Sequence, residues 1–122
     1  MFVLEKKNKD TMDALQIIAK ALSFKKLKVF GVAGTKDKRG ITTQRVTAFK
    51  LFPDNLKAKC SNLKNIKIGN VKFSDKELHF GMLSGNKFTI TLRDVNSCEE
   101  EIGIAMGNIK EKGFVNYFGL QR

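Results

Sequence analysis

A short polar loop between two apolar segments constrains the fold of this chain more than any other feature of its sequence. An apolar run from Val29 to Ala33 leads into the loop, and β-branched residues continue after it through Val46. Gly34 and Gly40 bound the loop and supply backbone freedom at its two bends. The pattern predicts a strand, a tight polar loop and a second strand.

Charged residues fill the apex of this loop, where Asp37 is the single carboxylate beside the cations Lys36, Lys38 and Arg39. Opposite charges nearby favour the ionised form, so we expect Asp37 to be a carboxylate at neutral pH. The loop is suited to an anionic ligand, although a merely solvated turn explains the same pattern. A Walker A loop does not fit, because that motif needs Gly-Lys followed by Ser or Thr.

The composition indicates one small domain that binds a polyanion. A length of 122 residues allows a single core, so we expect residues 1–122 to form one domain. The 23 Lys and Arg residues outnumber 12 acidic residues and give a net charge of +11, which makes nucleic acid the first candidate partner. Lysine-rich surfaces also occur on proteins that bind no polyanion.

Cysteine and histidine are too scarce for a metal site. Cys60 and Cys98 form no CxxC pair and His79 is the single histidine, whereas a zinc site needs about four such ligands. We expect both thiols to be reduced, with a disulfide between them as the alternative. No apolar run approaches the roughly 20 residues that span a bilayer, and the N-terminus does not resemble a signal peptide. We expect an intracellular protein without a membrane partner, in the cytoplasm or the nucleus.

Periodicity and turn residues predict strands alternating irregularly with helices. The expected strands lie at 2–4, 43–52, 66–73, 78–82 and 88–92, and the expected helices lie at 10–23, 54–62 and 98–112. Gly69 and Asn70 are expected to interrupt the strand at 66–73 as a bulge or a turn. Hairpin-connected strands mixed with helices favour an α+β fold with a largely antiparallel sheet and helices packed on one face.

Terminal residues support two of the helices. Asp10 or Thr11 can cap the first helix. Ser97 followed by Glu100 fits a capping box for the last helix, and Gly113 is suited to end it.

Several separated motifs resemble one enzyme family. The run Gly34–Arg39 followed by Thr42–Gln44 resembles the characteristic loop of the TruD-type pseudouridine synthases. Segments 85–93 and 113–122 resemble the same family in the same order. Residues 8–14 are similar to the start of a helix in its eukaryotic and archaeal members. The resemblance extends over nearly the whole chain.

The resemblance implies a pseudouridine synthase fold, which has the same α+β class but is larger. The chain would be a fragment, the N-terminal part of a catalytic domain that continues after Arg122. A basic residue that relatives place beside the aspartate from an upstream segment also has no counterpart. We therefore expect the isolated chain to isomerise RNA weakly or not at all, and its exposed sheet edges to favour a homo-oligomer.

The family converts uridine in RNA to pseudouridine without a cofactor or metal, and tRNA is the expected substrate. The resemblance identifies Asp37 as the catalytic carboxylate, either as a nucleophile or as a base. The target uridine must leave its stack to reach this residue.

Further roles follow from the same resemblance. Lys36, Asn86 and Phe88 would bind the substrate, with Phe88 stacking on the extruded uracil. Lys38 and Arg39 would contact RNA phosphates. The local sequence pattern alone, without the family resemblance, predicts that Asn86 is a turn residue and that Phe88 belongs to a core strand. Residues 116–122 are interpreted as structural or RNA-lining.

Two alternatives to an enzyme stay open. A non-catalytic basic RNA-binding module would use the loop only for phosphates, so Asp37→Ala would leave RNA binding intact or strengthen it. A structural or assembly protein would have no RNA affinity beyond a salt-sensitive background.

Overall fold

The computed structural model describes residues 1–115, and the chain divides into two compact units, Met1–Asn86 and Lys87–Arg122. Each unit is described by itself. The expectation of one domain over residues 1–122 stays a prediction. The interpretation of residues 116–122 concerns a segment outside the described residues.

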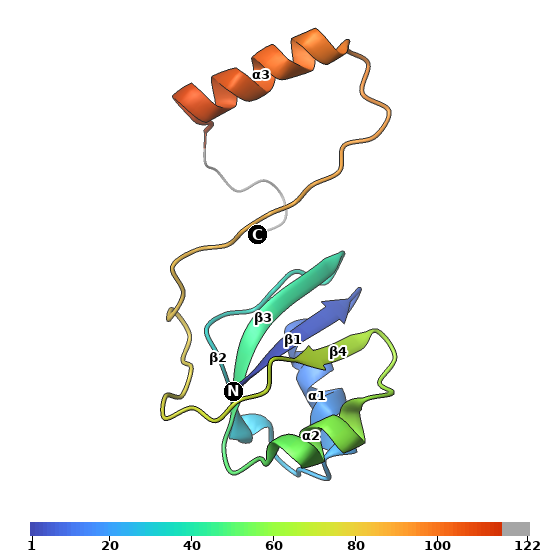
Figure 1. Ribbon diagram of the computed structural model, residues 1–122, viewed down its shortest axis with the longest axis vertical. Coiled ribbons are helices and arrows are strands. Elements are labelled where there is room, and N and C mark those ends of the chain that lie inside the picture. The colour runs from blue at the N-terminus through green and yellow to red at the C-terminus, as the bar shows by residue number, and fades with distance from the viewer. Residues whose placement is uncertain (116–122) are drawn as a thin grey trace. The chain divides into compact units, whose positions relative to one another are not determined.

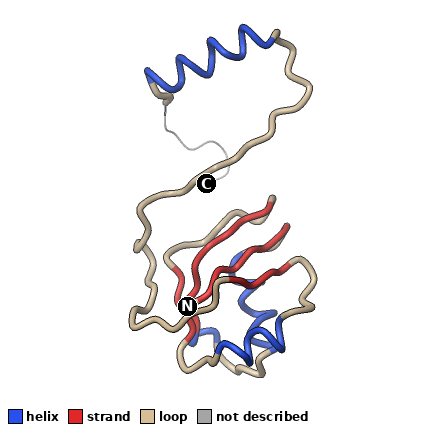
Figure 2. The backbone as a smooth tube through the Cα atoms, in the orientation of Figure 1, coloured by secondary structure: helices blue, strands red, loops and turns tan. Residues whose placement is uncertain are grey.

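A four-stranded sheet forms the centre of the first unit (Figure 2). Its strands are β1 (Phe2–Lys7), β2 (Phe30–Val32), β3 (Ile41–Ala48) and β4 (Ile66–Gly69), in the order β2-β3-β1-β4. All three neighbouring pairs are antiparallel. The antiparallel sheet and the α+β class expected from the sequence are confirmed.

Two helices, α1 (Thr11–Ala21) and α2 (Pro53–Cys60), cover one face of this sheet (Figure 1). A short 3-10 helix, η1 (Leu27–Val29), precedes β2. The Asp10 carboxylate accepts a hydrogen bond from the Met12 N–H at 2.7 Å, which confirms Asp10 as the cap of α1.

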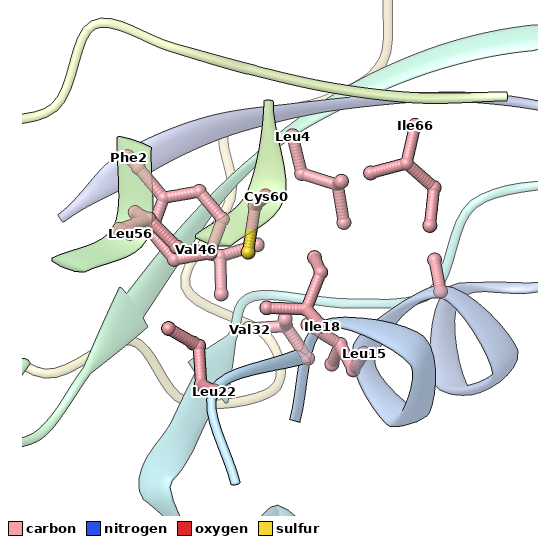
Figure 3. Close-up of a cluster of buried hydrophobic side chains, with 11 residues drawn as sticks. Phe2, Leu4, Leu15, Ile18, Leu22, Val32, Val46, Leu56, Cys60 and Ile66 are labelled. Atoms are coloured by element: carbon pink, nitrogen blue, oxygen red, sulfur yellow. The ribbon is translucent and has the colours of Figure 1, made fainter. Parts of the chain in front are cut away.

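The apolar core lies between the helices and the sheet (Figure 3). It is formed by Phe2, Leu4, Ala14, Leu15, Ile18, Leu22, Val32, Val46, Leu56, Cys60 and Ile66. Side chains of a strand alternate between its faces, so β1 directs Phe2, Leu4 and Lys6 toward the same side. The first two enter the core, whereas the third reaches a polar region beneath the β2–β3 loop.

The second unit contains α3 (Glu99–Lys112), and none of its described side chains is buried. Gly113 ends this helix with a φ of 74°, and its N–H donates to the Ile109 carbonyl at 2.9 Å, as the sequence predicts. The predicted capping box is wrong, because Cys98 occupies the cap position and provides no side-chain hydrogen bond. The helix begins one residue too late for Ser97 to cap it.

The strands predicted at 78–82 and 88–92 are also wrong, since neither segment forms a strand. A strand requires a neighbour that satisfies its backbone groups. The Leu78 N–H instead donates to Thr47 Oγ1 at 3.1 Å, and the Gly81 N–H donates to the Ala33 carbonyl at 2.9 Å. Residues 88–92 have no partner strand in the described part of the chain. The strand predicted at 66–73 forms only from Ile66 to Gly69, and it ends at the interruption that the sequence predicts at Gly69 and Asn70.

Both cysteines are free thiols, as expected, with Cys60 buried and Cys98 exposed. Burial raises the pKa of the Cys60 thiol, although the Lys59 ammonium opposes this effect. Within residues 1–115, no helix is long and apolar enough to cross a bilayer.

Candidate functional site

The candidate site is the loop that joins β2 to β3, residues 33–40. Gly40 has a φ of 123°, which confirms the predicted need for a glycine at this bend. Gly34 has no positive φ, so its predicted backbone freedom is not required.

At the apex, the side chains of Asp37, Lys38 and Arg39 are exposed and that of Lys36 is half-buried. The single ion pair in residues 1–115 joins Lys67 to Glu5. The cations beside Asp37 therefore do not hold its carboxylate in a salt bridge, and the carboxylate is accessible to a ligand.

The structure brings two of the predicted substrate-binding residues together. The Lys36 ammonium donates a hydrogen bond to the Asn86 side-chain carbonyl, across 50 residues of sequence. Phe88 belongs to the second unit and is 69% exposed, so its stacking role stays a prediction.

Beneath the loop lies a lysine that the sequence interpretation missed. Lys6 is only 1% exposed. Its Nζ donates to the carbonyl oxygens of Lys9 at 2.6 Å, Lys36 at 3.1 Å and Asp37 at 2.8 Å. Burial lowers the pKa of this ammonium, while the carboxylates of Asp10 and Asp37 act in the opposite direction.

Thr11 and Gln44 hold the first half of the same loop. The Thr11 hydroxyl accepts a hydrogen bond from the Lys36 N–H at 2.9 Å and donates one to Gln44 Oε1 at 2.9 Å. The Gln44 Nε2 then donates to the Gly34 carbonyl at 3.1 Å. The start of α1 and the strand β3 are thus joined to the loop backbone.

Asn8 holds the end of the loop. Its N–H donates to the Gly40 carbonyl at 2.9 Å, and its side-chain carbonyl accepts from the Gly40 N–H at 3.0 Å. Asn8 has a φ of 51°, a conformation that asparagine adopts more readily than most residues. Together we call Lys6, Asn8, Thr11 and Gln44 the polar brace of the loop.

Two sequence signals could have identified the brace. Extending the alternation of Phe2 and Leu4 by one step places Lys6 on the buried face of its strand. The run Asn8–Thr11 was interpreted only as the start of a helix, yet it also supplies two residues of the brace.

A cavity of about 440 Å³ adjoins the loop within the first unit. Its lining includes Gly34, Lys36, Gln44, Arg45, Leu78 and Ser84. The volume falls in the range typical of ligand sites, and two of these side chains are cationic. Asp37 is not part of the lining.

Comparison with known proteins gives consistent matches over the chain. Residues 1–122 match the family model described as TruD: tRNA pseudouridine synthase D. The chain is 42% identical over 121 residues to the "Pseudouridylate synthase 7 homolog" of Mus musculus, covering 99% of this chain and 18% of that protein. It is 46% identical over 121 residues to the "Probable tRNA pseudouridine synthase D 2" of Methanococcus maripaludis, covering 99% of this chain and 30% of that protein.

Among solved structures, the crystal structure of the putative tRNA pseudouridine synthase D from Methanosarcina mazei is similar, with a TM-score of 0.83 and 32% sequence identity. The similarity covers 98% of this chain and 28% of that one. The chain therefore spans less than a third of the length of these relatives.

Proposed function

Because the chain belongs to the TruD family of tRNA pseudouridine synthases, we propose that it supplies the catalytic carboxylate, Asp37, for isomerising uridine to pseudouridine in RNA. The substrate we propose is tRNA, the RNA named for the family and for the Methanococcus maripaludis relative. The observation that carries this proposal is an exposed carboxylate, without a salt bridge in residues 1–115, on a loop whose backbone is tied to the fold.

The reaction exchanges one bond to the ribose for another. The N1–C1′ bond of uridine breaks, a C5–C1′ bond forms, a proton leaves C5 and N1 gains a proton. Nothing is oxidised or reduced. One carboxylate can assist this exchange by attacking C1′ or by removing the proton at C2′. Either role requires Asp37 to be held at a defined position beside an extruded nucleotide.

The neighbouring side chains suit an RNA substrate. Lys38 and Arg39 are exposed beside Asp37, where cations can contact phosphates. The cavity next to Lys36 and Arg45 offers space for a nucleotide, and the amide of Asn86 offers hydrogen bonds to a base edge. In this proposal Phe88 stacks on the uracil.

A chimera provides the test in a complete enzyme. The 122 residues of this chain replace the matching segment of the Methanococcus maripaludis relative, which is 46% identical. Tritium release from tRNA labelled at C5 of uridine then measures the loss of the C5 proton. Asp37→Asn removes the nucleophile and base while keeping the shape, so we expect the rate to fall by at least about a thousandfold.

Asp75→Asn is the matched control, because Asp75 is another exposed carboxylate of the same unit. We expect its rate to equal that of the unsubstituted chimera. An Asp37→Asn chimera that keeps a rate within about tenfold of the Asp75→Asn rate would contradict the proposal and favour the RNA-binding module.

A further inference from the structure

We propose that Lys6 is the positioning residue for Asp37: its buried ammonium fixes the direction in which the Asp37 side chain leaves the loop. The inference rests on the proposed catalytic function of Asp37. It adds to the site a residue that lies 31 positions earlier in the chain.

The geometry follows from which carbonyl oxygens Lys6 contacts. The Lys36 carbonyl belongs to the peptide group before the Asp37 Cα, and the Asp37 carbonyl belongs to the peptide group after it. Lys6 Nζ lies 3.1 Å from the first oxygen and 2.8 Å from the second. Because φ and ψ of a residue relate its two flanking peptide planes, one ammonium that bonds to both restricts these torsions. The direction of the Asp37 Cα–Cβ bond is then set.

A third hydrogen bond completes this arrangement. An ammonium has three N–H donors, and Lys6 uses them on the carbonyls of Lys36, Asp37 and Lys9. The Lys9 carbonyl belongs to the segment between β1 and α1. Lys6 therefore ties the Asp37 loop to the body of the first unit instead of linking two parts of the loop.

Burying the Lys6 ammonium costs free energy, because the charge loses its hydration. Phe2 and Leu4 precede Lys6 on the inward side of β1, and an apolar residue in the third place would pack without desolvating a charge. An apolar side chain, however, could not donate to the loop. The ammonium at this position therefore holds the loop, which packing of the core alone does not require.

The other members of the brace act elsewhere on the loop. Thr11 bonds to the Lys36 N–H, Gln44 to the Gly34 carbonyl and Asn8 to both backbone groups of Gly40. Among the residues that the structure describes, Lys6 is the side chain that contacts both carbonyls flanking the Asp37 Cα.

The first test needs neither RNA nor activity. Amide hydrogen exchange is measured by NMR on the 122-residue chain for Lys6→Met and for Lys7→Met, which removes the same charge from the exposed neighbour in β1. The reporter is the Lys36 amide, which is bonded to Thr11, and the reference is the amide of Val46 in the core. We expect Lys6→Met to accelerate exchange at Lys36 by about tenfold or more and at Val46 by less than about twofold. Lys7→Met should change neither.

Two results would overturn the proposal. Equal exchange at Lys36 in the two variants would show that Lys6 does not order the loop. A parallel increase at Lys36 and Val46 in Lys6→Met would show that Lys6 only stabilises the fold. If Lys6→Met does not fold, Lys6→Gln is subjected to the same comparison and the same criteria, because its shorter side chain has two N–H donors and cannot satisfy all three carbonyls.

The second test separates positioning from binding in the chimera. At saturating tRNA, Lys6→Met should lower the single-turnover rate by about 10- to 100-fold, because a small displacement of a reacting group has effects of this size. The Kd for tRNA should stay within about twofold of that of Lys7→Met. Weaker binding with an unchanged rate would contradict a positioning role. Should Asp37→Asn stay active, the proposed function fails, while the exchange experiment still decides whether Lys6 orders the loop.

Discussion

The buried side chains of β1 lie in different surroundings at the two ends of the strand. At one end, Phe2 and Leu4 are packed in an apolar core that holds α1 and α2 against the sheet. At the other end, Lys6 is equally buried, but its ammonium donates hydrogen bonds to three backbone carbonyl oxygens, two of them in the Asp37 loop. A strand of six residues thus serves stability at its start and the candidate site at its end.

A second contrast separates the two units. The first unit buries its large apolar side chains around the sheet, whereas α3 in the second unit leaves Ile104, Met106 and Ile109 exposed. An isolated helix of this length is marginal in water, because most helical stability in proteins comes from packing of an apolar face. The cooperative stability of the chain should therefore reside in the first unit.

The largest expected effect is at the apolar end of β1. Leu4→Ala removes a fully buried side chain and should lower the free energy of unfolding by about 2–5 kcal/mol in urea titrations followed by circular dichroism. A loss below about 1 kcal/mol would mean that the core at this end does not hold the unit together.

A smaller loss of unfolding free energy is expected for a substitution in the polar brace. Thr11→Val keeps the shape of the side chain but removes the hydroxyl that bonds to the Lys36 N–H and to Gln44 Oε1, which should lower the unfolding free energy by about 1–3 kcal/mol. Thr11→Ser keeps the hydroxyl and is the matched control. Equal losses for both variants would show that the hydroxyl contributes nothing.

The stability contributions of a buried thiol in the apolar core, Cys60, and of the buried ammonium of the brace, Lys6, should depend on pH with opposite signs. Burial raises the pKa of Cys60 above 9.0, so the unfolded chain releases this proton first and stability falls as the pH rises above that value. Burial lowers the pKa of Lys6 below 10.5, so the unfolded chain retains this proton longer and stability rises between the lowered pKa and 10.5.

Unfolding free energies between pH 8 and 11 test these signs, with Cys60→Ala and Lys6→Met compared in turn with the unsubstituted chain. The contribution removed by Cys60→Ala should decrease with pH, and the contribution removed by Lys6→Met should increase. Slopes of the same sign would contradict the contrast between the apolar core and the brace.

The smallest effect is expected in the second unit. Ile104→Ala alters an exposed side chain of α3 and should change the unfolding free energy of the chain by less than about 0.5 kcal/mol. Ile18→Ala, the matched change in the buried face of α1, should cost about 2–5 kcal/mol. A comparable cost at Ile104 would show that α3 is packed in solution.

Local signals predicted features of both units. The Asp10 cap and the glycines at 40 and 113 each act through neighbouring residues, and each was identified from the sequence. The prediction of strands at 78–82 and 88–92 was wrong. Alternation of apolar and polar residues shows only that a segment could join a sheet, and no described strand pairs with either segment.

The candidate site was predicted only in part for the same reason. The charges around Asp37 are adjacent in sequence, so the loop and its family resemblance were identified directly. Lys6, however, meets Asp37 across 31 residues. Alternation along β1 can indicate that Lys6 is buried, but it does not indicate which backbone groups Lys6 contacts. Those contacts depend on the pairing of β1 with β3, which brings Lys6 beneath the loop.

A single distance tests the central claim most directly. A crystal structure of the Asp37→Asn chimera bound to a tRNA substrate would trap the unreacted uridine beside the loop. We predict that the substituted side chain at position 37 lies within about 3.5 Å of C1′ or C2′ of an extruded uridine. A loop that contacts only phosphates, with this side chain turned away from every ribose carbon of the target nucleotide, would contradict the account.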